Sequence, residues 1–380
     1  MSRILMKGNE AIAEAAIRAG AKNYFCYPIT PQTEVAEYLA RRMPEVGGVF
    51  LQGESELAVS NMLFGAASTG KRVFTTSSSP GISLMQEAIS YLAGAELPAV
   101  IVNIMRGGPG LGGILPAQSD YYQATKGGGH GDYRLLVLAP SSIQEAVDLM
   151  MLSFDLADKY RNPIMMIGDG MIGQMMEAVE FPDEDEEVDR PEIAEDWAAT
   201  GARDREPRII KSLFLDPVAL EKNSWKLNEK YEQMKREEVR YELYKVEIEN
   251  RLLIVSYGTM ARICQTAIDE LAAEGVSVGL FRPISLFPFP EAEIHEQATK
   301  KNIKKVLTIE MSTAQMNDDV EKAVKGKRPV HFFGRTGGIV PSVEEVKEQV
   351  YKLVARKKGA RTKGPVKKTK GKAAKTSRKE

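Results

Sequence analysis

The chain has few residues that could bind a metal through sulfur or imidazole. Among its 380 residues it has two cysteines, Cys26 and Cys264, and three histidines. Two thiols cannot hold an iron–sulfur cluster, which needs four ligands, and they exclude a disulfide framework. The three histidines are scattered, so their spacing gives no metal cluster. We therefore expect a protein of a reducing compartment that binds no metal through its own side chains.

The sequence also lacks long apolar runs and a strong charge of one sign. No apolar run is long enough to cross a bilayer, and no signal peptide precedes the first helical pattern. The formal net charge is −1, from 51 basic and 52 acidic residues, which gives the whole molecule no electrostatic preference for nucleic acid. These absences predict a soluble, cytoplasmic protein without a membrane partner.

The C-terminal segment 356–380 departs from this balance, because it is rich in Lys and Arg and has almost no large apolar residue. Such a segment cannot bury enough surface to offset the entropy of ordering it, so we expect a disordered basic tail. The tail could hold nucleic acid or an acidic protein. A solvated appendage explains the composition more simply, and we prefer that interpretation.

The remaining sequence predicts two α/β domains. Residues 1–180 alternate short apolar runs with helical patterns, which indicates a doubly wound parallel sheet covered on both faces. Residues 181–248 contain an acidic run and then a charged stretch, and we interpret them as a linker followed by one long helix over 217–244. The alternation resumes over 249–355, which predicts a second α/β domain.

Three polar motifs follow predicted strands of the first domain. They are Tyr27-Pro28-Ile29-Thr30-Pro31, Glu54-Ser55-Glu56 and the segment from Met105 to Gly110. The carboxyl ends of parallel strands form the ligand-binding edge of an open α/β sheet, so a hydroxyl, a carboxylate and a guanidinium are predicted to face one crevice. Such groups suit the binding of a small carboxylic acid.

Each motif also has a purely structural interpretation. Thr30 could cap a helix that has Pro31 at its first position. Glu54 is expected to be a helix cap, and Glu56 could stabilise a helix N-terminus. Arg106 could be a surface residue at a strand end. The segment Ser77 to Gly81 could be a polar turn before a helix, or it could line a substrate pocket.

Taken together, the motifs of this sequence resemble those of one subunit of the 2-oxoacid:ferredoxin oxidoreductases, the subunit that carries the thiamine diphosphate pyrimidine-binding domain. The resemblance is closest to the branched-chain, 2-oxoisovalerate type, and it covers residues 5 to 350. The resemblance rests on several sequence segments that occur in the same order as in that family: Met6 to Ala11, Tyr27 to Pro31, Ser79 to Ser83, Arg106 to Gly113, Lys126 to Tyr133, Gly168 to Met171 and Pro283 to Pro290. It implies that the first domain has the thiamine-diphosphate-binding fold and that the second resembles the transketolase C-terminal domain.

The resemblance also implies roles for single residues. Glu56 would hydrogen-bond the N1′ atom of the aminopyrimidine, so that the cofactor can lose its C2 proton, and this works best beside an apolar wall. Tyr27, Pro28 and Ile29 would contact the cofactor. Substrate contacts would come from Thr30 and Arg106, with Ser79 and His130 as weaker candidates; for His130 a loop histidine bonded to backbone is the simpler interpretation.

Gly168-Asp169-Gly170 invites comparison with the diphosphate and Mg²⁺ motif of thiamine enzymes. That motif needs an Asn downstream as a metal ligand, and the acidic stretch from Glu180 to Asp196 contains none. We reject the match. The chain is therefore expected to hold only the pyrimidine end of the cofactor, while a partner subunit holds the diphosphate and Mg²⁺.

The implied activity is the oxidative decarboxylation of a branched-chain 2-oxo acid, 3-methyl-2-oxobutanoate, to acyl-CoA, CO₂ and reduced ferredoxin. Iron–sulfur clusters would belong to partners, a ferredoxin-like subunit and a gamma-type subunit, and coenzyme A would be a co-substrate. Pyruvate and 2-oxoglutarate are alternative substrates, and 2-oxoglutarate would need a second cation such as Lys126, Arg134 or His130. A non-oxidative thiamine decarboxylase and a regulatory or scaffold subunit are rival interpretations.

Overall fold

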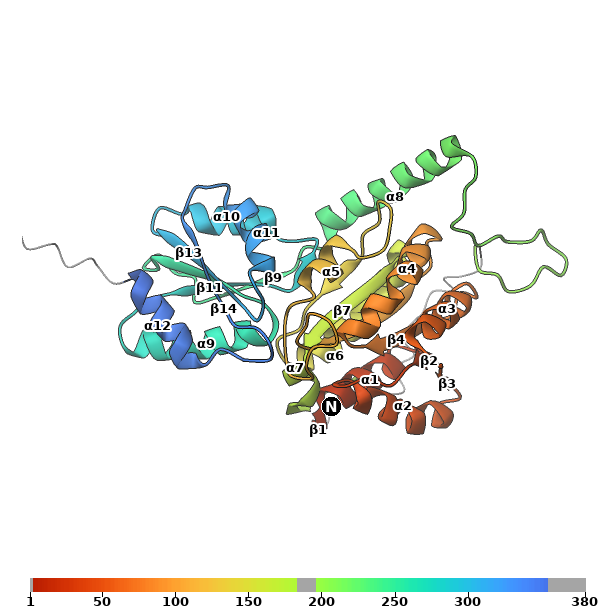
Figure 1. The fold of residues 1–380 in the computed structure, drawn as a ribbon, viewed down its shortest axis with the longest axis horizontal. Helices are drawn as coiled ribbons and strands as arrows, with labels where there is room; N and C mark the ends of the chain where they lie inside the picture. Colours follow the sequence, from red (N-terminus) through yellow and green to blue (C-terminus); the bar gives the residue numbers. More distant parts are fainter. Residues whose placement is uncertain (1–2, 183–195, 355–380) are drawn as a thin grey trace, which may run out of the picture.

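The computed structural model describes residues 3–182 and 196–354, which form two α/β units joined side by side (Figure 1). The first unit is built on a seven-stranded sheet in the order β12-β6-β7-β5-β4-β2-β3. Its strands are β2 (Asn23–Cys26), β3 (Val49–Gln52), β4 (Val73–Ser77), β5 (Ala99–Met105), β6 (Leu136–Leu138), β7 (Pro163–Asp169) and β12 (Ser285–Phe287). All neighbours are parallel except β12, which runs antiparallel to β6. The predicted parallel sheet is therefore confirmed.

Helices cover both faces of this sheet, as a buried parallel sheet requires. They are α1 (Gly8–Arg18), α2 (Thr33–Glu45), α3 (Glu56–Ala67), α4 (Ser79–Gly94), α5 (Tyr121–Lys126), α6 (Ile143–Tyr160) and α7 (Gly170–Gln174). One face packs against α1, α2 and α6, and the other against α3, α4 and α5. The central strands β5 and β7 are buried along their whole length, which explains their largely apolar sequences. A small antiparallel pair, β1 (Ile4–Lys7) with β8 (Met176–Val179), joins the two ends of this unit.

The second unit has a five-stranded sheet in the order β14-β13-β10-β11-β9. Its strands are β9 (Tyr241–Tyr244), β10 (Leu252–Val255), β11 (Gly279–Pro283), β13 (Lys305–Glu310) and β14 (Val330–Gly334). Helices α9 (Gly258–Ala273) and α12 (Val343–Val354) pack on one face, and α10 (Glu291–Thr299) and α11 (Gln315–Val324) on the other. The expected second α/β domain is thus present.

The two units share one hydrophobic core. Buried side chains of α4 and α5 belong to the same apolar cluster as Leu253, Phe281 and Met316 of the second unit. One strand also crosses between the units, because β12 follows β11 of the second unit in the chain but forms the edge of the first sheet. The second unit is therefore packed firmly against the first.

Several elements differ from the sequence-based expectations. The charged helix α8 (Pro217–Glu237) ends earlier than predicted, and residues 241–244 form β9, which pairs with β11. Strand β12 and helix α11 were not predicted. The expected acidic linker lies largely within residues 183–195, and the expected basic tail within residues 355–380, so both lie outside the described residues. No helix of the described part is long and apolar enough to cross a membrane.

Candidate functional site

The candidate residues lie at the carboxyl ends of four neighbouring strands. In the sheet order β5-β4-β2-β3, Arg106 follows β5, Ser79 follows β4, Thr30 follows β2 and Glu56 follows β3. Because these strands are parallel, their carboxyl ends lie at one edge of the sheet. The topology therefore brings the predicted carboxylate, hydroxyl and guanidinium to the same edge.

Glu56 is the first residue of α3, and its side chain is 6% exposed. The helix is capped by Ser55, whose hydroxyl accepts a hydrogen bond from the Ala58 amide at 3.2 Å. The expectation that Glu54 caps this helix is therefore wrong, and Glu54 is exposed. Within the described residues no group donates a hydrogen bond to the Glu56 carboxylate, so this buried acceptor is available for a ligand.

A glycine makes room for the Glu56 carboxylate. A Cβ added to Gly81, in the first turn of α4, would lie 2.6 Å from Oε1 of Glu56 and 2.1 Å from Oγ of Ser77. The helix begins at Ser79 rather than at Ser83 as predicted, because Ser78 takes the extended N-cap conformation and Pro80 lies in the first turn. The early start of α4 is what brings Gly81 against Glu56.

We expect Gly81→Ala to reduce activity and stability together. The added methyl group would clash with both the Glu56 carboxylate and Ser77, and overpacking of this kind costs about 1–3 kcal/mol. Gly65→Ala in α3 is the matched control, because nothing lies within 4 Å of its added Cβ. Thermal unfolding and turnover should both be measured. Equal activity of the two variants would show that the Glu56 position does not depend on Gly81.

Thr30 lies in a turn and does not cap a helix. Helix α2 begins at Thr33, with Gln32 as its N-cap residue, and Pro31 is not in its first turn. Gln32 is fully buried: its backbone amide donates to the Ile29 carbonyl at 3.2 Å, and its Oε1 accepts from the Thr76 hydroxyl at 2.5 Å. These bonds hold the chain in a turn before the helix can start. The hydroxyl of the exposed Thr30 is thereby left free of the capping role.

The other cofactor candidates form the start of the same turn. Tyr27 and Ile29 are half-buried and Pro28 is exposed. The Tyr27 carbonyl accepts a hydrogen bond from Nε2 of Gln32 at 3.4 Å. All three residues therefore follow the carboxyl end of β2, and Glu56 follows the carboxyl end of the neighbouring strand β3.

Arg106 is a buried cation, 7% exposed. Its Nη1 donates to the Thr30 carbonyl at 2.9 Å and its Nη2 to the Leu111 carbonyl at 3.2 Å, whereas its Nε is buried without a partner. No carboxylate of the described residues forms an ion pair with it. A buried guanidinium without a counter-charge favours binding of an anion.

Ser79 belongs to an internal network rather than to an open pocket wall. Its hydroxyl donates to Oδ2 of Asp120 at 2.5 Å and accepts from the Arg106 amide at 3.0 Å. Asn103 completes the network, since its Nδ2 donates to the same Asp120 oxygen at 2.9 Å and its Oδ1 accepts from the Ser79 amide at 3.0 Å. Burial raises the pKa of the Asp120 carboxyl above its ordinary value. Ser79 therefore supports the backbone of Arg106.

The structure does not bring His130 to this group. The His130 carbonyl accepts a hydrogen bond from the Ser90 hydroxyl at 2.7 Å, and its ring makes an edge contact with Tyr91. Ser90 and Tyr91 lie near the end of α4, about 16 Å along the helix from Ser79 at 1.5 Å per residue. A substrate contact by His130 therefore stays a prediction without support from this arrangement.

Asp169 is the N-cap residue of α7, and the expectation that Gly168-Asp169-Gly170 is not a diphosphate and Mg²⁺ motif stays a prediction. It is 1% exposed, and its Oδ1 accepts from the Met171 amide at 2.8 Å at the start of α7. Burial raises the pKa of its carboxyl. Within residues 3–182 and 196–354, no three His, Cys, Asp or Glu side chains are grouped to hold a metal ion.

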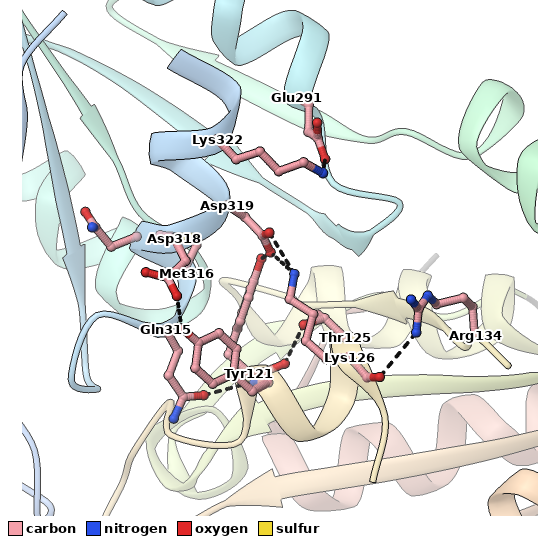
Figure 2. A network of polar contacts seen from close by, with 12 residues as sticks. Tyr121, Thr125, Lys126, Arg134, Glu291, Gln315, Met316, Asp318, Asp319 and Lys322 are labelled. Carbon is pink, nitrogen blue, oxygen red and sulfur yellow. Dashed lines mark hydrogen bonds and ion pairs between the residues drawn. The ribbon is translucent and has the colours of Figure 1, made fainter. Parts of the chain in front are cut away.

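A cavity of ≈ 470 Å³ lies between the two units and is separate from Glu56, Thr30 and Arg106. It contains two of the three cations that could have bound a distal carboxylate, Lys126 and Arg134. Lys126 is already neutralised by Asp319, whose two oxygens lie 2.7 and 2.6 Å from its Nζ (Figure 2). Arg134 donates to the backbone carbonyl of Lys126 at 3.2 Å. These two cations therefore do not extend the Arg106 site.

Sequence reasoning missed three supporting residues of the site: Gly81, Asn103 and Asp120. Gly81 lies in the segment Ser79 to Ser83 that carries the family resemblance, but its closeness to Glu56 depends on where α4 starts. Asn103 is a fully buried polar residue within the apolar strand β5, and that anomaly is a signal of a network. Asp120 precedes a short helix and carried no signal of its own.

Two family descriptions match the chain. Residues 14–245 match "Pyruvate flavodoxin/ferredoxin oxidoreductase, thiamine diP-bdg", and residues 251–346 match "Pyruvate:ferredoxin oxidoreductase core domain II". The first match includes all the candidate site residues. The second covers most of the second α/β unit.

Similar proteins agree with these matches. The ketoisovalerate oxidoreductase subunit VorB of Methanothermobacter thermautotrophicus is 48% identical over 350 residues, which are 92% of this chain and 97% of the relative. The solved 2-oxoglutarate:ferredoxin oxidoreductase of Magnetococcus marinus, with 2-oxoglutarate, coenzyme A and succinyl-CoA bound, has a TM-score of 0.82 and 26% identity over 92% of this chain and 65% of that chain. A split gene transketolase has a TM-score of 0.56 and 15% identity over 91% of this chain and 97% of that chain, a likeness of fold alone. The expected thiamine-enzyme and transketolase-like fold is thus confirmed. The chain belongs to the pyruvate flavodoxin/ferredoxin oxidoreductase family, and its first α/β unit is the thiamine-diphosphate-binding domain of that family.

Proposed function

We propose that this chain is the subunit of a 2-oxoisovalerate:ferredoxin oxidoreductase that holds the pyrimidine end of thiamine diphosphate and the carboxylate of the 2-oxo acid. The observation that carries the proposal is the pairing of two groups at one sheet edge. Among the described residues, Glu56 is a buried residue whose carboxylate accepts no hydrogen bond, and Arg106 is a buried residue whose guanidinium pairs with no carboxylate. One group suits the ring nitrogen of a cofactor, and the other suits an acidic substrate.

The residues around Glu56 fit the pyrimidine end of the cofactor. The carboxylate has a free acceptor position among the described residues, and the absence of a side chain at Gly81 is what lets the carboxylate lie against α4. Thiamine diphosphate, when bound, supplies the ring carbon that adds to the 2-oxo group. The part of Glu56 is to hold a proton shared with the pyrimidine N1′ atom, in a position that burial keeps away from water.

Arg106 and Thr30 are the proposed substrate-binding pair. The hydrogen bond from Nη1 of Arg106 to the Thr30 carbonyl fixes the two residues relative to each other. The N–H groups of the Arg106 guanidinium that the Thr30 and Leu111 carbonyls do not use, together with the Thr30 hydroxyl, are proposed to orient the carboxylate and the keto oxygen of a 2-oxo acid. This arrangement would hold the substrate next to the cofactor before bond making begins.

The remaining parts of the reaction are proposed to come from other chains. Oδ1 of Asp169 is engaged as the cap of α7, which supports the proposal that another chain holds the diphosphate and Mg²⁺. Both cysteines are buried and separate, and burial raises the pKa of Cys26 to about 11 and of Cys264 to about 12, which disfavours cluster-ligating thiolates. We therefore propose a partner with the diphosphate domain, a ferredoxin-like iron–sulfur subunit, a gamma-type subunit, coenzyme A as co-substrate and ferredoxin as electron acceptor.

A branched-chain substrate is favoured over 2-oxoglutarate. The VorB relative is named for ketoisovalerate and is 48% identical to this chain, whereas the solved 2-oxoglutarate enzyme is 26% identical. The geometry points the same way, because Lys126 is held by Asp319 and lies in a separate cavity. Within the described residues, then, no predicted second cation joins Arg106.

Substrate preference tests the proposal directly. The native complex that contains this chain should reduce a viologen with coenzyme A and 2-oxoisovalerate, and kcat/KM for 2-oxoglutarate should be lower by about 100-fold, because a distal carboxylate would be buried without a partner. Pyruvate should also be a poorer substrate, since it loses the apolar contacts of the branched chain. A higher kcat/KM for 2-oxoglutarate would keep the chemistry and overturn the assigned substrate.

A further inference from the structure

The segment 116–122 is a bridge between the substrate arginine and the second α/β unit. It follows the loop after β5 and leads into α5. At its start, Pro116 forms an isolated antiparallel bridge with Arg106, and the Leu115 carbonyl accepts from the Gly107 amide at 3.1 Å. Further along, Asp120 accepts from Ser79, which supports the Arg106 amide. The Arg106 backbone is therefore contacted by this segment directly and through Ser79.

Gln118 lies between these two contacts and is held by the second unit. It is fully buried, and all four of its polar groups bond to residues at the ends of β10 and β13. Its amide donates to the Met311 carbonyl at 2.9 Å, and its Oε1 accepts from the Met311 amide at 2.9 Å. Its Nε2 donates to the Tyr257 carbonyl at 2.9 Å, and its carbonyl accepts from the Tyr257 hydroxyl at 3.2 Å. Gln118 thus has no polar group left for its own unit.

We call the hydrogen bonds of Gln118 to Tyr257 and Met311 the clamp. The second unit also contacts the chain on both sides of Gln118. Figure 2 shows the contact of α5 with α11, where the Tyr121 hydroxyl donates to Asp319 at 2.6 Å and the Tyr122 amide donates to Oε1 of Gln315 at 2.9 Å. Before the bridge, Gly338 packs so closely against Leu115 that an added Cβ would lie 2.4 Å from the Leu115 Cβ. The loop that carries Arg106 is therefore held at its base by the second unit.

The buried carboxylate of Glu310 fixes the conformation of the segment that binds Gln118 in the second unit. Glu310 at the end of β13 accepts from the Ser312 hydroxyl at 2.7 Å and from the Met316 and Asn317 amides at 3.0 and 3.1 Å. These bonds hold residues 311–315 in one conformation, so that Met311 presents both its amide and its carbonyl to Gln118. Met311 is therefore held firmly by the second unit. Because segment 116–122 contacts the backbone of Arg106, a displacement of Gln118 from Met311 would also displace the loop that follows Arg106.

We propose that Gln118 is a positioning residue for Arg106, and that the second α/β unit has a part in binding the 2-oxo acid by holding Arg106 in place. This inference rests on the proposed function, in which Arg106 binds the substrate carboxylate. Loss of the clamp should raise KM for the 2-oxo acid, because it misplaces the guanidinium fork by a fraction of an ångström. KM for coenzyme A should not change.

The test is a double-mutant cycle in the native complex. Gln118→Glu keeps the shape of the side chain but replaces the donor to the Tyr257 carbonyl, and we expect KM for 2-oxoisovalerate to rise about tenfold, as for one lost buried hydrogen bond. Tyr257→Phe removes one hydroxyl without adding a charge and should raise the same KM by about threefold. In an Arg106→Lys background both changes should have little further effect, since the residue through which they act is already altered.

A second inter-unit contact provides the matched control. Arg282 is 5% exposed and joins Glu145 and Glu242, but it does not touch the segment 116–122. Arg282→Lys should lower the unfolding temperature without changing KM for the 2-oxo acid. If Gln118→Glu and Tyr257→Phe only lower the unfolding temperature, or if their effects on KM persist unchanged beside Arg106→Lys, the positioning role is overturned. If Arg106→Lys alone leaves KM unchanged, the proposed substrate role of Arg106 fails, and the inference fails with it.

Discussion

Replacing Glu56 by glutamine should lower kcat for 2-oxo acid oxidation by about 10²- to 10⁴-fold, the contribution expected of a positioned acid–base group. Glutamine has nearly the same shape, so the packing against Gly81 is kept. The amide can still form a hydrogen bond, but it cannot hold the proton that a carboxyl group shares with a ring nitrogen. The measurement is 2-oxoisovalerate-dependent viologen reduction by the purified complex.

Glu54→Gln is the matched control for this experiment. Glu54 lies two residues earlier in the chain, before the N-cap of α3, and is exposed, so the same chemical change should leave kcat within about twofold, as for an ordinary surface substitution. The unfolding temperature and the subunit composition of both variants should equal those of the wild type. Comparable losses in the two variants would show that the effect is one of local charge rather than of a carboxyl group at position 56.

Replacing Arg106 by lysine should lower kcat/KM for the 2-oxo acid by about 10- to 100-fold, with most of the effect in KM. Lysine keeps the positive charge but loses the planar fork that reaches two acceptors at once. In the unmodified chain the guanidinium donates one hydrogen bond to the Thr30 carbonyl and one to the Leu111 carbonyl. The single ammonium of lysine cannot replace both bonds and also bind a carboxylate. A charge-assisted hydrogen bond contributes about 1.5–3 kcal/mol, which sets the expected range.

Arg134→Lys provides the comparison for the arginine experiment. Arg134 is exposed and lies in the separate cavity between the units, so KM for 2-oxoisovalerate should not change. KM for coenzyme A should be measured for both variants, because a general loss of active-site order would raise it as well. Equal KM values for the 2-oxo acid in wild type and Arg106→Lys would contradict the substrate role.

The sheet-edge position of the site could be predicted from the sequence, because it depends on local signals. Apolar runs followed by polar motifs locate the ends of β2, β3 and β5, and parallel α/β topology brings such ends to one edge. The finer placement depended on contacts that are distant in the sequence. A helix cap was one of two open interpretations of Thr30, but buried Gln32 bonds to Thr76 on another strand, and helix α2 begins only at Thr33.

The joining of the two units could not be predicted from local patterns. Strand β12 is three residues long and pairs with β6, which lies almost 150 positions earlier in the sequence. Strand β9 follows α8 so closely that its residues were predicted as the end of the helix. Gln118 carried no motif, and its importance appears only when the ends of β10 and β13 are placed around it. Such long-range pairing is decided by tertiary packing rather than by propensity.

The most direct test of the central claim is the exchange rate of the thiamine C2 proton with deuterium in the complex, followed by quenching and NMR of the released cofactor. This measurement isolates proton removal from substrate binding and from electron transfer. The account predicts rapid exchange with wild-type chain and exchange slower by about 10²- to 10⁴-fold with Glu56→Gln, while Arg106→Lys leaves the rate nearly unchanged. Equal exchange rates in wild type and Glu56→Gln would contradict the assignment of Glu56 as the carboxyl group that activates the cofactor.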